Sequence, residues 1–176
     1  MVGFSADNVK MGGRVVLPYR PVYLRKDDFI MAAEYSFVPL QTIDVDENVT
    51  FMDGDRACKK GFITHRSGSG IFFLKGSNNG CRATYRVTFD GNIAVAAADD
   101  GGVLEPISIA LTINGEALGN ATAIVTPAAI GDFFNVSVTT FIDVPCGCCV
   151  TVSVENTSDT SAIDVTNANI IFDRVA

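Results

Sequence analysis

Three of the five cysteines lie within four positions, in the stretch DVPCGCCVTV that runs from Asp143 to Val152. Closely spaced thiols are the residue type used by zinc sites and by redox pairs. The segment Val144-Pro145-Cys146-Gly147 has proline and glycine where a type I turn prefers them. We therefore predict that the chain reverses there and that a strand begins at Cys148.

The register of this predicted strand separates the cysteine side chains. Cys148 has the parity of the valines that follow it and is expected to face the core, whereas Cys149 is expected to face outward. Cys81 is expected to face the core of its own strand. Thiols on opposite faces do not converge on one tetrahedral ion, so we expect no metal site. The odd cysteine count and the lack of an export signal favour reduced thiols.

The single histidine, His65, excludes any mechanism that needs two histidines from one chain. Its context, ITHRSGSG, contains neither a G-x-S-x-G nucleophile elbow nor the G-K-[ST] ending of a phosphate loop. A histidine at a strand end beside a glycine turn is more typical of a structural residue than of a catalytic one. We expect no enzymatic activity and no cofactor.

One group of oxygen ligands could bind calcium. Asn92, Asp99, Asp100 and Glu105 lie near one predicted loop, and calcium takes six or more oxygens. The spacing of a D-x-D-x-D-G loop is missing, which favours an acidic turn at a sheet edge.

The elements that carry these residues are predicted strands. In the segment Cys81 to Phe89, apolar and polar residues alternate, which indicates a half-buried strand. The same pattern recurs in ISIALTI, FNVSVTTFIDV and VTVSV, and the last segment, NANIIFDRV, is more apolar on both faces. Turns are predicted at Ser67–Gly70, Asp99–Gly102 and Asn114-Gly115, the last a type I′ hairpin turn. About eight strands and no helix predict an all-β antiparallel sandwich or jelly roll of two four-stranded sheets.

Residues 1–57 lack a sustained period and contain Pro18, Pro21 and Pro39. We predict an extended N-terminal arm over 1–57 and a sandwich domain over 58–176. The alternative is that this segment packs on the sheet of its own domain. The arm contains a group of basic and tyrosine side chains suited to binding an acidic protein surface: Arg14, Tyr19, Arg20, Tyr23, Arg25 and Lys26.

The charge is unevenly distributed along the chain. Residues 1–86 carry a net charge of +3 and residues 87–176 a net charge of -10. An acidic surface disfavours nucleic acid and anionic membrane as partners. No apolar run reaches the length of a membrane span, and the first residues lack the pattern of a signal peptide, so we expect synthesis in a cytoplasm.

A family resemblance extends over Cys58 to Ala176. The segments GFITHRSGSGIFFLKG, CRATYRVTFDGNIAV, ISIALTINGEAL, TAIVTPAAIGDFFNVSVTTFIDVPCGCCVTVSVENTS and DVTNANIIFDRVA resemble structural proteins encoded by phages and prophages of gut bacteria. The strand order is also similar to that of the trimeric C1q/TNF-like jelly rolls. The resemblance implies a virion protein, made in the bacterial host cytoplasm, that acts as a trimeric capsid decoration or head-fibre protein. Its partner would be the major capsid protein or another virion protein, with the arm as the tether.

A trimer requires an apolar contact surface. The expected interface residues come from two places: the apolar final strand, and the outward-facing phenylalanines of the predicted strand around FNVSVTTFIDV. They are Phe133, Phe141, Ile170, Ile171 and Phe172. The alternative function is a receptor- or glycan-binding module of a fibre or tail. That alternative predicts exposed aromatic residues on the distal loops, and the predicted loops contain none.

Overall fold

The computed structural model describes residues 32–57, 61–77, 81–97 and 104–175. These residues form eleven strands, and no helix occurs among them that is long and apolar enough to span a membrane. The strands are β1 (Ala32–Phe37), β2 (Gln41–Ile43), β3 (Met52–Asp53), β4 (Ile63–His65), β5 (Phe72–Lys75), β6 (Arg82–Val95), β7 (Ile107–Ile113), β8 (Glu116–Val125), β9 (Phe134–Pro145), β10 (Cys149–Asn156) and β11 (Ile163–Arg174).

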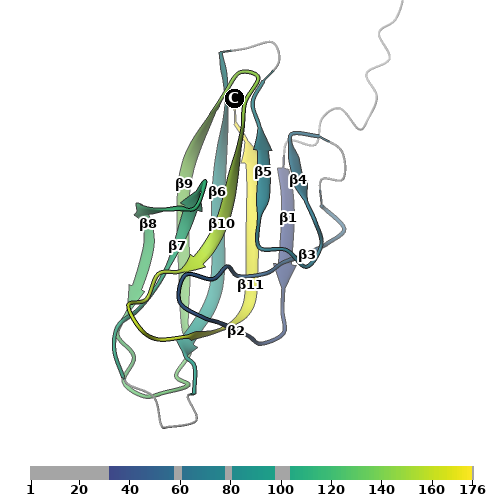
Figure 1. Ribbon diagram of the computed structural model, residues 1–176. Helices are drawn as coiled ribbons and strands as arrows, with labels where there is room; N and C mark the ends of the chain where they lie inside the picture. Colours follow the sequence, from purple (N-terminus) through teal and green to yellow (C-terminus); the bar gives the residue numbers. More distant parts are fainter. Residues whose placement is uncertain (1–31, 58–60, 78–80, 98–103, 176) are drawn as a thin grey trace, which may run out of the picture.

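The strands form two antiparallel sheets packed face to face (Figure 1). Sheet A is six-stranded, with the order β3-β1-β11-β6-β9 and with β2 also paired to β11. Sheet B is five-stranded, with the order β4-β5-β10-β7-β8. In Figure 1, β10 of sheet B crosses in front of β6 and β11 of sheet A. The predicted all-β antiparallel sandwich is confirmed.

Alternation places the core between the two sheets. On β6, every second residue from Ala83 to Phe89 is fully buried, and on β9 the same holds for Val136 to Val144 with only slight exposure. Successive side chains of a strand point to opposite faces, so one face of each strand is removed from water. Each large apolar side chain buried in this way contributes about 1.5 to 3 kcal/mol to folding.

An aromatic cluster forms one part of this core. Tyr35 of β1, Phe72 of β5 and Phe172 of β11 are almost completely buried, and their ring centroids lie 4.8 to 6.2 Å apart. Phe51 packs on Phe72 at 5.5 Å. Such tilted and edge-on contacts stabilise aromatic pairs beyond the area that they bury.

The predicted hairpin turns are present where the structure describes them. Asn114 and Gly115 both have positive φ, 53° and 83°, as a type I′ turn between β7 and β8 requires. The segment Ser67–Gly70 joins β4 and β5, which pair antiparallel. Asp99–Gly102 lies outside the described residues.

The segment 32–57 belongs to the sandwich and not to an extended arm. It supplies β1, β2 and β3 to sheet A, and the side chains of Tyr35 and Phe51 are in the core. Among the described residues, the sandwich therefore begins at residue 32 and not at residue 58. Strands of two to six residues are too short to show a sustained period, which is why the sequence pattern missed these three and predicted about eight strands instead of eleven.

Candidate assembly surface

The outer face of sheet A is lined by polar cross-strand pairs. Arg82 Nη1 lies 3.0 Å from Asp143 Oδ2, and Arg86 forms an ion pair with Asp173 across the neighbouring strands. Thr88 and Thr139 share a 3.0 Å hydrogen bond between their hydroxyl groups. Residues directly opposite in an antiparallel pair lie close enough for such contacts. Arg82 and Arg86 are thus both paired within one protomer.

Further amide and carboxylate groups follow the same pattern. Asn135 donates to Asn92 Oδ1 at 3.1 Å, and Asn169 donates to Glu34 Oε1 at 3.2 Å. The Asn169 Oδ1 atom is buried without a hydrogen-bond partner. A buried amide oxygen without a donor costs free energy, so this atom lowers the stability of the fold.

The predicted interface residues separate into two groups. Ile170 and Phe172 are 0% exposed inside one protomer, because their parity on β11 turns them into the core. They are not available to a partner chain. Ile171 lies between them on the outer face and is partly exposed, while Phe133 and Phe141 are 47% and 65% exposed.

Several further large apolar side chains are exposed that the sequence did not single out. Ile124 on β8 is 70% exposed, and Met52 on β3 is 47% exposed. The strands β8 and β9 are the edges of sheets B and A and lie in contact. Ile124 has the parity of the outer face of sheet B, whereas Phe141 has the parity of the outer face of sheet A. The alternation within one strand does not reveal which edge strands of the two sheets will meet.

The arm residues lie outside the described residues. Arg14, Tyr19, Arg20, Tyr23, Arg25 and Lys26 all precede residue 32. Their predicted role in binding a capsid stays a prediction.

His65 is a packed side chain and not an accessible functional group. Its side chain is 0% exposed, with Nδ1 2.8 Å from Asp53 Oδ1 and Nε2 2.9 Å from the Ser69 carbonyl oxygen. The ring stacks on Phe72 with the centroids 4.4 Å apart. This arrangement ties β3, β4 and the following turn together and leaves no ring nitrogen facing solvent.

The cysteines differ from the predicted register. Cys81 and Cys148, both expected in the core, are exposed, as are Cys146 and Cys149. The turn is one residue later than predicted, because the Cys148 amide donates to the Pro145 carbonyl oxygen at 3.1 Å and β10 begins only at Cys149. The residues of positive φ include Gly147 at 71°, which fits a type II turn.

The candidate calcium ligands that the structure describes do not form a cluster. Asp99 and Asp100 lie outside the described residues, and Asn92 is engaged by Asn135. Glu105 accepts hydrogen bonds from Ser161 and Thr160, which lower the pKa of its carboxyl group. Within the described ranges, no three His, Cys, Asp or Glu side chains are placed to hold a metal ion.

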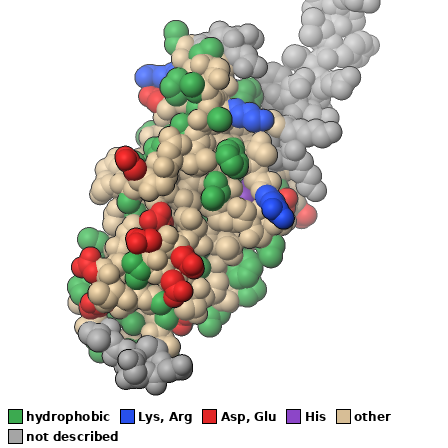
Figure 2. Space-filling view, viewed as in Figure 1, with side chains coloured by type: hydrophobic (Ala, Val, Ile, Leu, Met, Phe, Trp, Pro, Cys, Tyr) green, Lys and Arg blue, Asp and Glu red, His purple; other side chains and the backbone are tan. Residues whose placement is uncertain are grey.

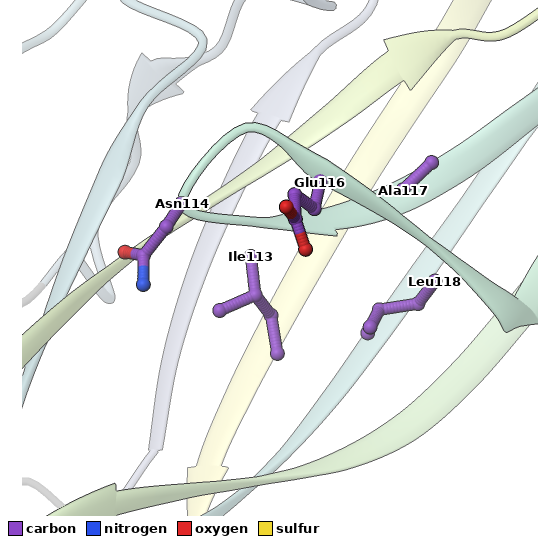
Figure 3. A pocket seen from close by; sticks show the side chains of 5 residues that line it. All are labelled: Ile113, Asn114, Glu116, Ala117 and Leu118. Atoms are coloured by element: carbon purple, nitrogen blue, oxygen red, sulfur yellow. The ribbon is translucent and has the colours of Figure 1, made fainter.

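The β7–β8 hairpin borders a surface hollow with a mixed apolar and polar lining. This hollow, of about 510 Å³, lies under the hairpin, where Ile113 and Leu118 point to the same side and Glu116 sits beside them (Figure 3). All of its lining residues come from this one hairpin. Enzyme pockets collect polar groups from several elements, and this hollow does not.

Acidic and basic groups are separated on the face that carries sheet B. Figure 2 shows the Asp and Glu side chains mainly over the lower half of the molecule and the Lys and Arg side chains over the upper half. The visible groups are spread over the surface and do not converge on a hollow.

No protein-family model matches the chain, and no curated protein matches it. Solved structures do match. The structure of Eiger TNF from S. frugiperda aligns with a TM-score of 0.60 at 12% identity, over 83% of this chain and 92% of that one. The fold is a C1q/TNF-like jelly roll. The globular domain of zebrafish complement 1qA supports the same conclusion, with a TM-score of 0.57 at 12% identity over 82% of this chain and 97% of that one. At this identity the likeness establishes the C1q/TNF-like fold alone.

Proposed function

We propose that this chain is a non-enzymatic structural protein that assembles as a homotrimer and decorates a virion. The sandwich forms the trimer, and the segment before residue 32 tethers it to the major capsid protein or another virion protein. The C1q/TNF-like fold supports the non-enzymatic and trimeric parts of the proposal. The resemblance to phage structural proteins supports the virion part.

The observation that carries the trimer is the pair of exposed phenylalanines at the β9 edge of sheet A. Phe141 lies on β9, and Phe133 directly precedes this strand. Phe133 and Phe141 are eight residues apart, which is about 27 Å along a strand. Large exposed apolar residues spread along an edge are typical of a contact surface.

The outer face of sheet A is the complementary surface. Both arginines of this face that lie on β6, Arg82 and Arg86, are already paired with carboxylates of the same protomer, so covering them leaves no unpaired guanidinium group. It also offers the partly exposed Ile171 side chain to a neighbour. An edge that packs on the face of the next molecule is a heterologous contact, which closes into a ring when the rotation allows.

The test of the trimer is the double variant Phe133→Ser/Phe141→Ser. We expect light scattering to report a trimer for the parent protein and monomers for the variant, with an unchanged far-ultraviolet circular dichroism spectrum. The matched control is Phe73→Ser, since Phe73 is 45% exposed on β5 of the other sheet. A double variant that stays trimeric, or a control that dissociates equally, would contradict the proposed surface.

The test of the tether is co-sedimentation with bare capsids. Because β1 begins at Ala32, the informative deletion removes residues 1–31 and leaves the sandwich intact. We expect the full chain to sediment with capsids and the deletion to remain in the supernatant. Equal binding by both proteins would show that the tether lies elsewhere.

A further inference from the structure

Four exposed cysteines gather at one end of the sandwich. Cys81 directly precedes β6, Cys146 and Cys148 lie in the turn between β9 and β10, and Cys149 begins β10. This end is at the top of Figure 1, beside the C-terminus. Cys58 lies outside the described residues.

Cys81 and Cys146 are cross-strand neighbours. The β6–β9 ladder pairs Arg82 with Pro145, and the next residues outward are Cys81 and Cys146. The Cys146 amide donates a 3.1 Å hydrogen bond to the Cys81 carbonyl oxygen, so the two backbones stay in contact one residue beyond the end of the ladder. In a hydrogen-bonded antiparallel pair the Cα atoms lie about 5.5 Å apart. Disulfides join Cα atoms about 4.4 to 6.8 Å apart.

The two side chains also leave the ladder on the same side. Cys81 has the parity of Ala83, and Cys146 has the parity of Val144; both of these residues are completely buried on the inner face. Directly opposite residues of an antiparallel pair share a face. The cysteines remain exposed because they lie beyond the last core layer.

The other two cysteines have no such neighbour. The Cys148 carbonyl accepts a 2.9 Å hydrogen bond from the Gly76 amide, and Cys149 is paired with Lys75. Cys148 and Cys149 therefore lie opposite Gly76 and Lys75 on the neighbouring strand, and neither of these residues has a thiol. Cys81 and Cys146 are the one pair among the described cysteines that the register places opposite each other.

We propose that Cys81 and Cys146 form an intramolecular disulfide by exchange with a low-molecular-weight disulfide. The thiolate of one cysteine attacks the reagent, whose sulfur–sulfur bond breaks and releases one reagent thiol. The second cysteine then attacks the protein sulfur of the mixed disulfide and releases the second reagent thiol. The two protein thiols lose two electrons and two protons, which the reagent disulfide gains.

The bond would join the start of β6 to the end of β9. It would close a loop that contains β7 and β8, so it would restrict the unfolded chain. We expect oxidation to raise the midpoint of thermal unfolding by about 5 to 15 °C. This inference does not depend on the proposed function.

The experiment uses two matched triple variants of the full chain. In Cys58→Ser/Cys148→Ser/Cys149→Ser only Cys81 and Cys146 remain, and in Cys58→Ser/Cys81→Ser/Cys146→Ser only Cys148 and Cys149 remain. Each folded protein is treated with oxidised glutathione and weighed by mass spectrometry. We expect the first to lose two hydrogens and become resistant to alkylation as a monomeric chain. We expect the second to gain glutathione.

Three results would overturn the proposal. They are stable glutathione adducts on both cysteines of the first variant, a bond between chains instead of within one, and an unchanged unfolding midpoint after oxidation. If the triple variants do not fold, the parent protein is oxidised, alkylated and digested, and the linked peptides are sequenced. A link from Cys81 to Cys146 supports the proposal, whereas a link to Cys148 or Cys149, or no link, contradicts it.

Discussion

The hydroxyl group of Tyr85 donates a 2.6 Å hydrogen bond to the main-chain carbonyl oxygen of Lys75. Tyr85 is on β6 of sheet A and Lys75 ends β5 of sheet B, so this bond joins the two sheets at one end of the sandwich. The tyrosine side chain is completely buried. A buried hydroxyl needs such a partner, and the carbonyl of the opposite sheet supplies it.

The first prediction concerns this bond. Tyr85→Phe keeps the ring in the core and removes the donor. We expect the free energy of unfolding to fall by about 1 kcal/mol, the ordinary net value of one hydrogen bond. Urea denaturation followed by circular dichroism measures the change. No loss of stability would show that water replaces the tyrosine hydroxyl at the Lys75 carbonyl.

The second prediction concerns the close approach of β5 to the cysteine turn. A Cβ atom added at Gly76 would lie 1.9 Å from the Pro145 carbonyl oxygen, which is a main-chain atom that cannot rotate away. Gly76→Ala is expected to lower the free energy of unfolding by about 1 to 3 kcal/mol. Gly119→Ala is the matched control, since nothing lies within 4 Å of its added Cβ. Equal unfolding midpoints for the two variants would contradict the tight packing at Gly76.

The third prediction concerns the buried histidine. His65→Ala removes a hydrogen bond to Asp53, a hydrogen bond to the Ser69 carbonyl and the stacking on Phe72. We expect a loss of about 2 to 4 kcal/mol in the free energy of unfolding. Asp53→Asn is the milder comparison, because it keeps the ring in place. A fully stable His65→Ala protein would show that the β3–β4 region contributes little to the fold.

The fourth prediction is a pH dependence. Partial burial and, to a lesser degree, the nearby Asp46 carboxylate raise the pKa of Glu155 above its ordinary value of 4.5. Folding therefore favours the protonated form of Glu155. The charged carboxylate lowers the free energy of unfolding, and this loss is absent below pH 4.5 and grows as the pH rises through the raised pKa of the folded state.

Glu155→Gln should therefore stabilise the protein at pH 7 by a few tenths to about 1 kcal/mol and should have little effect at pH 4. Urea denaturation at the two pH values measures this difference. Glu116→Gln, on the exposed β7–β8 hairpin, is the control variant. A stabilisation by Glu155→Gln that is equal at both pH values would rule out charge as its cause.

Alternation in the sequence was sufficient for the long strands and for the class of fold. The patterns around Tyr85, Val138 and Val152 predicted which residues are buried, because a period of two holds along any strand whose one face meets the core. The Asn114-Gly115 turn was also predicted, since few residue pairs accept positive φ at both positions.

The short strands, and the points at which the long strands end, could not be predicted in the same way. Tyr35 and Phe51 are core residues, yet they lie in strands too short to show a period. Cys81 and Cys148 have the same parity as the buried residues of their strands, but they lie beyond the last layer of the core and are exposed. Alternation alone predicted them to be buried, because it does not show where the core ends.

The sequence by itself determined the all-β class, the inward and outward faces of the long strands and the lack of catalytic spacing around His65. Only the tertiary structure decided which edges meet, which of Ile170, Ile171 and Phe172 reach the surface, and that Cys81 lies opposite Cys146. The physical reason is that side-chain direction is a local property of the backbone, whereas strand pairing and the end of a sheet depend on contacts between residues far apart in the chain.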